Sequence, residues 1–179
     1  FNQDISGWDV SNVTDMASMF TDAYSFNADI TGWDTGNVTT MEHMFYQVVS
    51  PVAFDQDLSG WNVTALTNAD DMFEGMSLSP DNYDALLAGW DAQALQPGVL
   101  FDAGGSVYCK SETERAHMIS SDGWTITDGG KNCYYYESFV MTVQTDLPGD
   151  SADNQFEIRT EGTGYNYNVD CDSNRYYDA

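Results

Sequence analysis

One twenty-residue pattern occurs three times in the first half of this chain. It begins at residue 1 as FNQDISGWDVSNVTDMASMF, at residue 26 as FNADITGWDTGNVTTMEHMF and at residue 54 as FDQDLSGWNVTALTNADDMF. The tryptophans Trp8, Trp33 and Trp61 are 25 and 28 residues apart, and a Met-Phe pair keeps the same spacings. Such a period with fixed apolar positions is typical of a solenoid, in which each coil buries its apolar face by stacking on the next.

The apolar positions of the repeat predict a shared core, because a stripe of tryptophan and methionine is more typical of a core than of a cofactor site. The residues expected to point inward are, in order, Ile5, Trp8, Val10, Val13, Met16, Met19, Phe20, Ile30, Trp33, Val38, Met41, Met44, Phe45, Leu58, Trp61, Val63, Leu66, Met72 and Phe73. The third repeat has Ala65 where the others have Asn, and Ala69 where they have Met. This departure is typical of a coil near the end of an array.

Composition limits the partners of the chain. It has 179 residues, of which 42% are apolar, and this is enough to supply a core. Its 29 acidic residues outnumber five Lys and Arg, so the formal net charge of -24 repels nucleic acid and anionic membrane surfaces. Such a surface suits solubility, cation binding or a neutral or basic partner. No apolar run reaches membrane-spanning length, no signal peptide opens the chain, and Phe1 stands within a repeat, so we expect a fragment of a longer protein.

Aspartate and asparagine also recur at fixed positions. Asp4, Asp29 and Asp57 follow the opening Phe of each repeat by three residues. Stacked carboxylates repel, so each either caps backbone N–H groups in its own turn, which we favour, or shares a cation with its neighbours. Asn12, Asn37 and Asn62 stand in Asn-Val-Thr sequences that match the glycosylation motif, but we interpret them as repeat residues. We expect Asn12 and Asn37 to bond the bends of neighbouring coils.

The sequence FNQDISGWDVSNVTDMASMF and its two successors resemble the bacterial surface-protein repeat of about 26 residues in BspA-like leucine-rich-repeat proteins and mycoplasma-type lipoproteins. The resemblance covers residues 1–78. It implies an α+β repeat solenoid of leucine-rich-repeat type, with short strands and short helical turns, on extracellular bacterial proteins associated with adhesion. It implies no ligand and no catalytic residue.

Residues 79–133 predict a mixed cap at the end of the array. Ser79 followed by Pro80 indicates a helix start, and Ser111 with Glu114 has the pattern of a capping box before a second helix. The sequence GVLFDAGGSVYC predicts a strand interrupted by Gly-Gly, and WTIT predicts another strand.

The cysteines predict a disulfide in this cap. Cys109 and Cys133 flank its second helix and second strand, without the C-x-x-C spacing of metal sites. A disulfide between them would close a loop of about 25 residues, contribute about 3 kcal/mol and require an oxidising compartment. Two buried free thiols are the alternative. Cys171 is the odd cysteine, and we expect its partner to lie beyond Ala179.

Residues 134–179 predict the first strands of a β-sandwich of immunoglobulin or PKD type. The segments FVMTVQT, QFEIRT and YNYNVDCD each predict a strand, and together they resemble the opening of the sandwich that often accompanies such repeats. Three strands cannot close a two-sheet core, so this segment would need the cap, another chain or further strands for support.

The last segment also carries alternating oxygen ligands. Asp170, Asp172, Asn174 and Asp178 match part of a Ca²⁺ loop, because this ion takes six to eight oxygens from a tight turn. However, Arg175 stands where an EF-hand loop needs Gly, and no Glu follows at the twelfth position. A Ca²⁺ site is therefore one interpretation and a solvated polar turn is the other. We predict no required cofactor, with Ca²⁺ as an optional ligand.

A polar surface is expected beside the inward residues of each repeat. We call it the repeat face, and its residues are Thr14, Asp15, Ser18, Thr39, Thr40, His43, Thr67, Asn68 and Asp71. Solenoids bind partners through such extended faces, so we take it as the candidate ligand surface, with a merely solvated face as the alternative. Its threonine column also resembles that of ice-binding solenoids, which we disfavour because only three repeats with variable neighbours are present.

Catalysis is the least favoured function. His43 and His117 are far apart in sequence, neither lies in an H-x-x-H frame, and no Gly-rich phosphate loop follows a strand. We predict a non-enzymatic extracellular protein, secreted or on the bacterial cell surface, that binds protein or glycan. The alternative is a structural stalk or fibre subunit that assembles end to end with copies of itself, stiffened by Ca²⁺.

Overall fold

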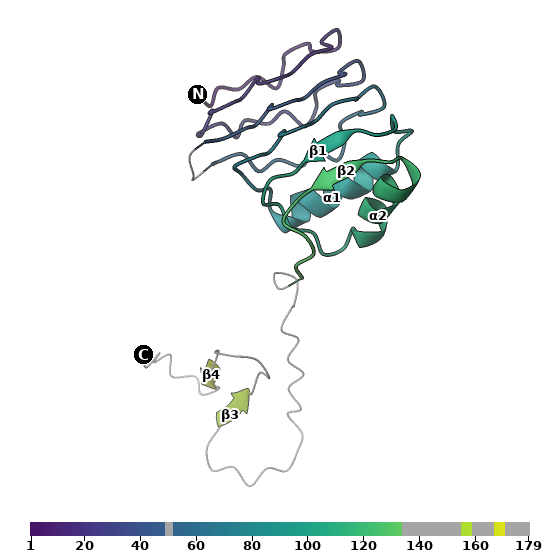
Figure 1. The fold of residues 1–179 in the computed structure, drawn as a ribbon. Helices are drawn as coiled ribbons and strands as arrows, with labels where there is room; N and C mark the ends of the chain where they lie inside the picture. Colours follow the sequence, from purple (N-terminus) through teal and green to yellow (C-terminus); the bar gives the residue numbers. More distant parts are fainter. Residues whose placement is uncertain (49–51, 134–154, 159–166, 171–179) are drawn as a thin grey trace. The chain divides into compact units, whose positions relative to one another are not determined.

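The structure is a computed structural model that describes residues 1–48, 52–133, 155–158 and 167–170 (Figure 1). The chain divides into two units, Phe1–Ser138 and Phe139–Ala179, which we describe separately. The helices and strands are, in order, α1 (Pro80–Asp91), β1 (Leu100–Asp102), α2 (Glu112–Ser121), β2 (Thr125–Thr127), β3 (Gln155–Ile158) and β4 (Tyr167–Asp170).

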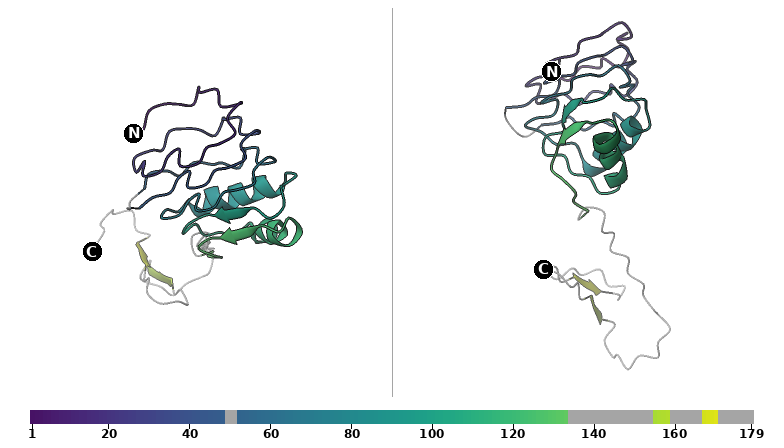
Figure 2. Two further views of the ribbon diagram at one scale, coloured as in Figure 1. Left: turned by 45° about the horizontal axis from the view of Figure 1, so that its top comes forward. Right: turned by 45° about the vertical axis from the view of Figure 1, so that its right-hand side comes forward.

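The three repeats are hydrogen-bonded to one another along their backbones. Parallel bridges pair Asp15 with Thr40 and Thr40 with Asn68. The amide of Met16 donates to the carbonyl of Thr40 at 3.0 Å, and the amide of Met41 donates to the carbonyl of Asn68 at 2.9 Å. Equivalent residues of successive repeats therefore lie side by side, and the turns of this part of the chain follow one another in layers (Figures 1 and 2).

The aromatic residues of the repeats form stacks through the first unit. Trp33 stacks on Trp8, with ring centres 6.4 Å apart, and on Trp61, at 6.5 Å. A second stack, with ring centres 5.5 and 5.2 Å apart, consists of Phe20, Phe45 and Phe73. Because each ring covers its neighbours, the repeats share one hydrophobic core, and most of the side chains that the sequence places inward are buried in it.

Two of the predicted core residues are exposed instead. Trp8 is 54% exposed and Met19 is 38% exposed, whereas their equivalents in the second repeat, Trp33 and Met44, are 4% and 0% exposed. The prediction was wrong for Trp8 and Met19. A core side chain such as Trp33 is covered by a repeat on each side, whereas the first repeat has a neighbouring repeat on one side only in this structure.

Helix α1 continues the tryptophan series of the repeats. The indole N–H of Trp90 donates to the carbonyl of Leu58 at 3.1 Å, just as that of Trp61 donates to the equivalent carbonyl of Ile30 at 3.0 Å. Gly89 lies close to the third repeat, since a Cβ there would be 2.3 Å from the carbonyl oxygen of the residue after Leu58. The Gly-Trp pair of the repeat therefore recurs inside the helix because the helix packs against the third repeat as a further repeat would.

The two helices of the first unit begin at the predicted residues but are capped differently. Ser79 is the N-cap of α1, and its hydroxyl accepts the amide of Asn82. Ser111 precedes α2 but makes no side-chain bond to that helix, so the predicted capping box was wrong. Its hydroxyl donates instead to the carbonyl of Asp84 in α1 at 2.7 Å, because the two helices lie close enough for this competing bond.

The strands of the cap extend the line of bridges between the repeats. Strand β1 pairs in parallel with β2, and Leu100 lies opposite Thr125. Ala69 of the third repeat forms a parallel bridge with Phe101 of β1. The backbone pairing that begins at Asp15 in the first repeat therefore continues to the cap.

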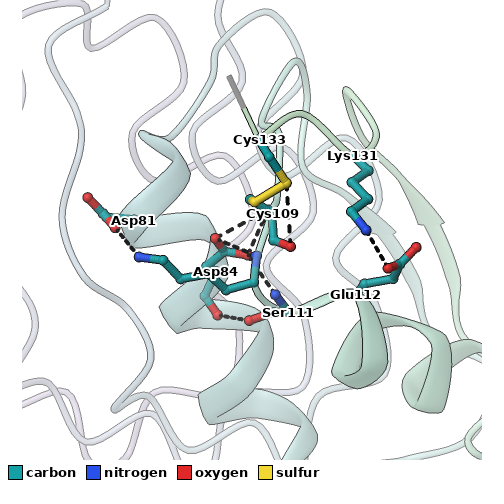
Figure 3. The surroundings of a disulfide bond; sticks show 8 residues. Asp81, Asp84, Cys109, Ser111, Glu112, Lys131 and Cys133 are labelled. Carbon is teal, nitrogen blue, oxygen red and sulfur yellow. Dashed lines mark hydrogen bonds and ion pairs between the residues drawn. A yellow bond between two sulfur atoms is a disulfide. The ribbon is translucent and has the colours of Figure 1, made fainter. Parts of the chain in front are cut away.

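A disulfide joins Cys109 and Cys133, the pairing that the sequence favoured over two free thiols (Figure 3). The segment that carries Cys109 is fixed to α1 by the buried carboxylate of Asp84. This carboxylate accepts the backbone N–H groups of Cys109, Lys110 and Ser111 at 2.9 to 3.2 Å. A crosslink and a charge-assisted cluster therefore hold the same segment.

In the second unit, β3 pairs with β4 in antiparallel register, with Gln155 opposite Asp170. These strands fall within the predicted segments QFEIRT and YNYNVDCD. The predicted strand FVMTVQT lies outside the described residues. The β-sandwich stays a prediction.

Candidate functional site

The repeat face is brought together by the bridges between repeats. Asp15, Thr40 and Asn68 are the bridged residues themselves, and the other members lie within three residues of one of them. All nine side chains are exposed or half-buried. The structure therefore places the predicted residues on one surface that crosses three repeats.

A left-handed residue recurs on this face in every repeat. Ser18, His43 and Asp71 occupy equivalent positions and have φ angles of 58°, 54° and 51°. Non-glycine residues seldom adopt this conformation, and Asn, Asp and His do so more readily than most. The fold thus presents three different side chains, a hydroxyl, an imidazole and a carboxylate, from the same backbone turn.

The threonine column of the repeat face is largely used within the protein. The hydroxyl of Thr39 donates to the carbonyl of Thr14 at 3.0 Å, and the hydroxyl of Thr67 donates to the carbonyl of Thr39 at 2.9 Å. These protons are therefore committed to joining the repeats. Recognition through this face would depend more on its charged and amide groups than on its threonines.

A charged cluster lies at the centre of the face, between the second and third repeats. The Nε2 atom of His43 is 3.1 Å from Oδ2 of Asp71, and its Nδ1 atom is 3.8 Å from Oε1 of Glu42. The side-chain amide of Asn68 donates to Oε2 of Glu42 at 3.3 Å. The ring of Tyr46 meets the imidazole edge-on, with ring centres 5.3 Å apart. We call these five residues the imidazole cluster.

Sequence reasoning missed two carboxylates here, one within the imidazole cluster and one beside it. Glu42 and Asp70 directly precede His43 and Asp71, but the equivalent residue of the first repeat is Ala17, so no constant column indicated them. The available signal was that each of them directly precedes a residue of the repeat face.

The negative charge beside this face affects the titration of a neighbouring carboxyl. Burial raises the pKa of Asp102, and the nearby carboxylates of Asp71, Asp70 and Asp128 raise it further. The amide of Gly104, 2.6 Å from one of the Asp102 oxygens, acts in the opposite direction. The repulsion between these groups indicates that this part of the molecule favours positive charge in a partner.

The aspartate column caps turns, as the favoured interpretation predicted. The carboxylates of Asp4, Asp29 and Asp57 each accept the backbone N–H of the residue two positions later, at 2.9 to 3.0 Å. Bonds from the hydroxyl and the amide of Ser6 lower the pKa of Asp4, and the corresponding bonds from Thr31 lower that of Asp29. Each charge is thus stabilised within its own repeat.

Bonds between the bends of neighbouring repeats come from two asparagine positions. The predicted one is present at Asn37, whose side-chain amide donates to the carbonyl of Ser11 at 2.7 Å. A second ladder was missed: the side-chain oxygen of Asn2 accepts the amide of Asn27, and that of Asn27 accepts the amide of Asp55. Its signal was the Asn, Asn, Asp series after the opening Phe of each repeat.

The predicted Ca²⁺ ligands lie at the edge of the described chain. Asp170 is the last residue of β4. Asp172, Asn174 and Asp178 lie outside the described residues. The Ca²⁺ site stays a prediction.

A hollow lies between the third repeat and the cap. It is open to solvent and is lined by Val52, Glu74, Gly75, Met76, Ser77, Gly104 and Gly105. Glu74 is the one ionisable side chain among these lining residues, whereas acid-base chemistry needs convergent groups. Within the described residues, no helix has the length and apolar character that crossing a membrane requires.

Comparison with known proteins identifies the repeats. Searches of curated proteins and of solved structures found no match. The leucine-rich-repeat-like solenoid, the relation to BspA-like proteins and the immunoglobulin or PKD module therefore stay predictions. A family model described as a Mycoplasma protein of unknown function, DUF285, matches residues 1–90, which comprise the three repeats and nearly all of α1. The resemblance to mycoplasma-type repeats is thus confirmed at the level of the family, and the chain belongs to the DUF285 family of Mycoplasma proteins.

Proposed function

We propose that this protein is a non-enzymatic extracellular surface protein that binds a protein or glycan through the repeat face. The observation that carries the proposal is the imidazole cluster, in which side chains of two repeats meet on an accessible surface. Its histidine and carboxylates are half-exposed, with side chains of His43 and Asp71 at 37% and 42%. They are held in place by contacts with one another and still present polar atoms to solvent.

The charge of this surface favours one class of partner. Glu42, Asp70 and Asp71 lie together on a chain whose net charge is -24. A cationic protein surface would be steered toward these carboxylates and would be favoured over an acidic one. A neutral glycan remains compatible with the hydrogen-bonding groups of Asn68 and His43. Nucleic acid is disfavoured by the same charge.

Location outside the cell is part of the proposal. The disulfide between Cys109 and Cys133 suits an oxidising compartment, because cytosolic reductants keep most thiols reduced. Membership of a family of repeat proteins, with no membrane-spanning helix among the described residues, fits a secreted or cell-surface protein.

The binding proposal is tested on arrays of glycans and of purified surface proteins, both basic and acidic. The chain is compared with Glu42→Lys, which reverses a charge within the imidazole cluster, and with Glu112→Lys, which makes the same change on α2 outside the face. We expect a signal for the unaltered chain and Glu112→Lys, and at least a tenfold weaker signal for Glu42→Lys. Equal loss in both variants would show that only net charge matters, and binding unaffected by Glu42→Lys would exclude this face.

The structural alternative is a stalk or fibre subunit whose copies associate end to end, stiffened by Ca²⁺ at the predicted loop. It is supported by the parallel bridges that run from Asp15 in the first repeat to Phe101 in the cap, because they join the repeats into one continuous stack. Sedimentation velocity at rising protein concentration tests the association. Melting with Ca²⁺ and with EGTA tests the ion, since an unchanged midpoint would exclude stabilisation by Ca²⁺.

A further inference from the structure

A second cluster of ligand-type side chains lies in the cap, outside the repeat face. Asp91 is the last residue of α1, His117 lies in α2, and Asp122 is the C-cap of α2. One ligand atom from each of the three residues lies within 4.8 Å of the other two. The Nδ1 atom of His117 is 2.7 Å from Oδ1 of Asp91. The C-terminal ends of both helices therefore bring their side chains to one place.

The helix ends make this place electrostatically suited to a cation. The C-terminus of a helix carries a partial negative charge, of about half an elementary charge, and basic side chains in the last turn usually offset it. Neither α1 nor α2 has a basic residue in its last turn. Two helix ends and the carboxylates of Asp91 and Asp122 thus concentrate negative potential around one imidazole.

The donor set distinguishes between classes of metal ion. Ca²⁺ and Mg²⁺ prefer oxygen ligands throughout, whereas imidazole nitrogen combined with carboxylate oxygen suits Zn²⁺ and the neighbouring transition metals. Zn²⁺ takes such ligands at about 2.0 to 2.2 Å in tetrahedral geometry, which brings ligand atoms to roughly 3.5 Å from one another. The side chain of His117 is 55% exposed, so it can turn by the small amount that this requires and leave the fourth position to water. Asp91, with its side chain 17% exposed, is the more fixed ligand.

We propose that Asp91, His117 and Asp122 form a Zn²⁺-type metal site that joins the C-terminal ends of α1 and α2. This proposal is independent of the repeat face and of the predicted Ca²⁺ loop. A bound ion would replace the direct contact between His117 and Asp91 and would tie the two helices together at the ends away from the disulfide segment, which is held by Asp84. The site would therefore stabilise the cap rather than act on a substrate.

The experiment is calorimetric titration of the whole chain with ZnCl₂, without an affinity tag and after treatment with iodoacetamide, so that no added histidine or free thiol competes. We expect one ion per chain with micromolar affinity and a raised melting temperature. His117→Gln and Asp122→Asn should each weaken binding at least tenfold. Both residues are at least partly exposed, so the variants should fold, which far-ultraviolet circular dichroism checks.

Two controls distinguish Zn²⁺ binding at His117 from binding elsewhere on the chain. His43→Gln removes the other histidine of the chain and should leave Zn²⁺ binding unchanged, and titration with CaCl₂ should produce no binding that depends on His117. Proton NMR should also show the imidazole signals of His117, and not those of His43, shifting with added Zn²⁺. Absence of Zn²⁺ binding, or binding that survives in folded His117→Gln, would overturn the proposal and leave only an ion pair between His117 and Asp91.

Discussion

The tryptophan stack predicts very different effects for one substitution at equivalent positions of two repeats. Trp61 is fully buried, stacks on Trp33 at 6.5 Å and donates its indole N–H to the carbonyl of Ile30 at 3.0 Å. Trp8 occupies the same position of the first repeat but is 54% exposed and stacks on Trp33 from the other side at 6.4 Å. The comparison therefore varies burial and the indole hydrogen bond, while the residue type and its stacking partner stay the same.

Trp61→Ala should lower the free energy of unfolding by about 4 kcal/mol, the central value for removing a large aromatic side chain from a core. Part of this loss is the bond from the indole N–H to Ile30, which contributes about 1 kcal/mol; the carbonyl of Ile30 keeps its bond from the backbone N–H of Trp33. Trp8→Ala removes a single stacking contact at the surface and should cost about 1 kcal/mol. We thus expect the two variants to differ by about 3 kcal/mol.

Urea denaturation followed by circular dichroism measures this difference, provided that the m values agree. If Trp61→Ala does not fold, Trp61→Phe keeps an aromatic ring and removes the indole N–H, and it should cost about 2 kcal/mol. A Trp8→Ala variant destabilised as much as the Trp61 variant would refute the reasoning. It would show that coverage of a tryptophan on both sides does not determine its contribution to stability.

Three further predictions concern the cap. Asp84→Asn should lower the free energy of unfolding by about 2 kcal/mol in chemical denaturation, because a charged acceptor of three backbone N–H groups is lost. The control Asp81→Asn should lower it by less than about 0.5 kcal/mol, since the ion pair of Asp81 with Lys110 is exposed. Reducing the disulfide between Cys109 and Cys133 should cost about 3 kcal/mol, and an unchanged melting temperature in dithiothreitol would contradict this. The raised pKa of Asp102 means that the folded state binds the proton more tightly than the unfolded state does, so the contribution of Asp102 to stability falls as pH rises above 3.8 through the raised value. Asp102→Asn should flatten that part of the plot of unfolding free energy against pH. The same slope in the variant and the unaltered chain would contradict this prediction.

The buried columns were predictable because equal residues at a fixed period meet equal neighbours. Trp33 is buried between the first and third repeats, which the sequence shows, whereas Trp61 is buried between the second repeat and α1. The exposure of Trp8 was not predictable from its own repeat, because burial in a stack depends on what lies next to the repeat rather than on its residues. The packing of α1 against the third repeat was not predicted. The segment has a helical pattern, and for this reason Gly89 and Trp90 were not recognised as the Gly-Trp pair of the repeat.

The candidate site was predictable in position but not in chemistry. The columns of Ser18, His43 and Asp71 indicated a surface, but no glycine marked the left-handed turn on which all three are placed. Hydroxyl bonds such as that from Thr67 to Thr39 depend on the distance between neighbouring repeats, which the sequence does not state. Side-chain contacts across repeats, such as that of Glu42 with Asn68, depend on the same distance. Pairing in space therefore decides which polar atoms remain available.

This use of polar atoms also explains how so acidic a chain stacks its repeats. Carboxylates repel when stacked, but the bonds that Asp4 and Asp29 accept within their own repeats favour the charged form, as the lowered pKa values of both indicate. Hydrogen bonds within each repeat thus offset the repulsion between the stacked carboxylates, so these repeats can stack without an ion between them. Asp102 behaves in the opposite way, since burial and its acidic neighbours disfavour its charge. Cation binding in the first unit should therefore occur beside such unrelieved carboxylates or at the ends of α1 and α2, and not along the aspartate column that caps the turns.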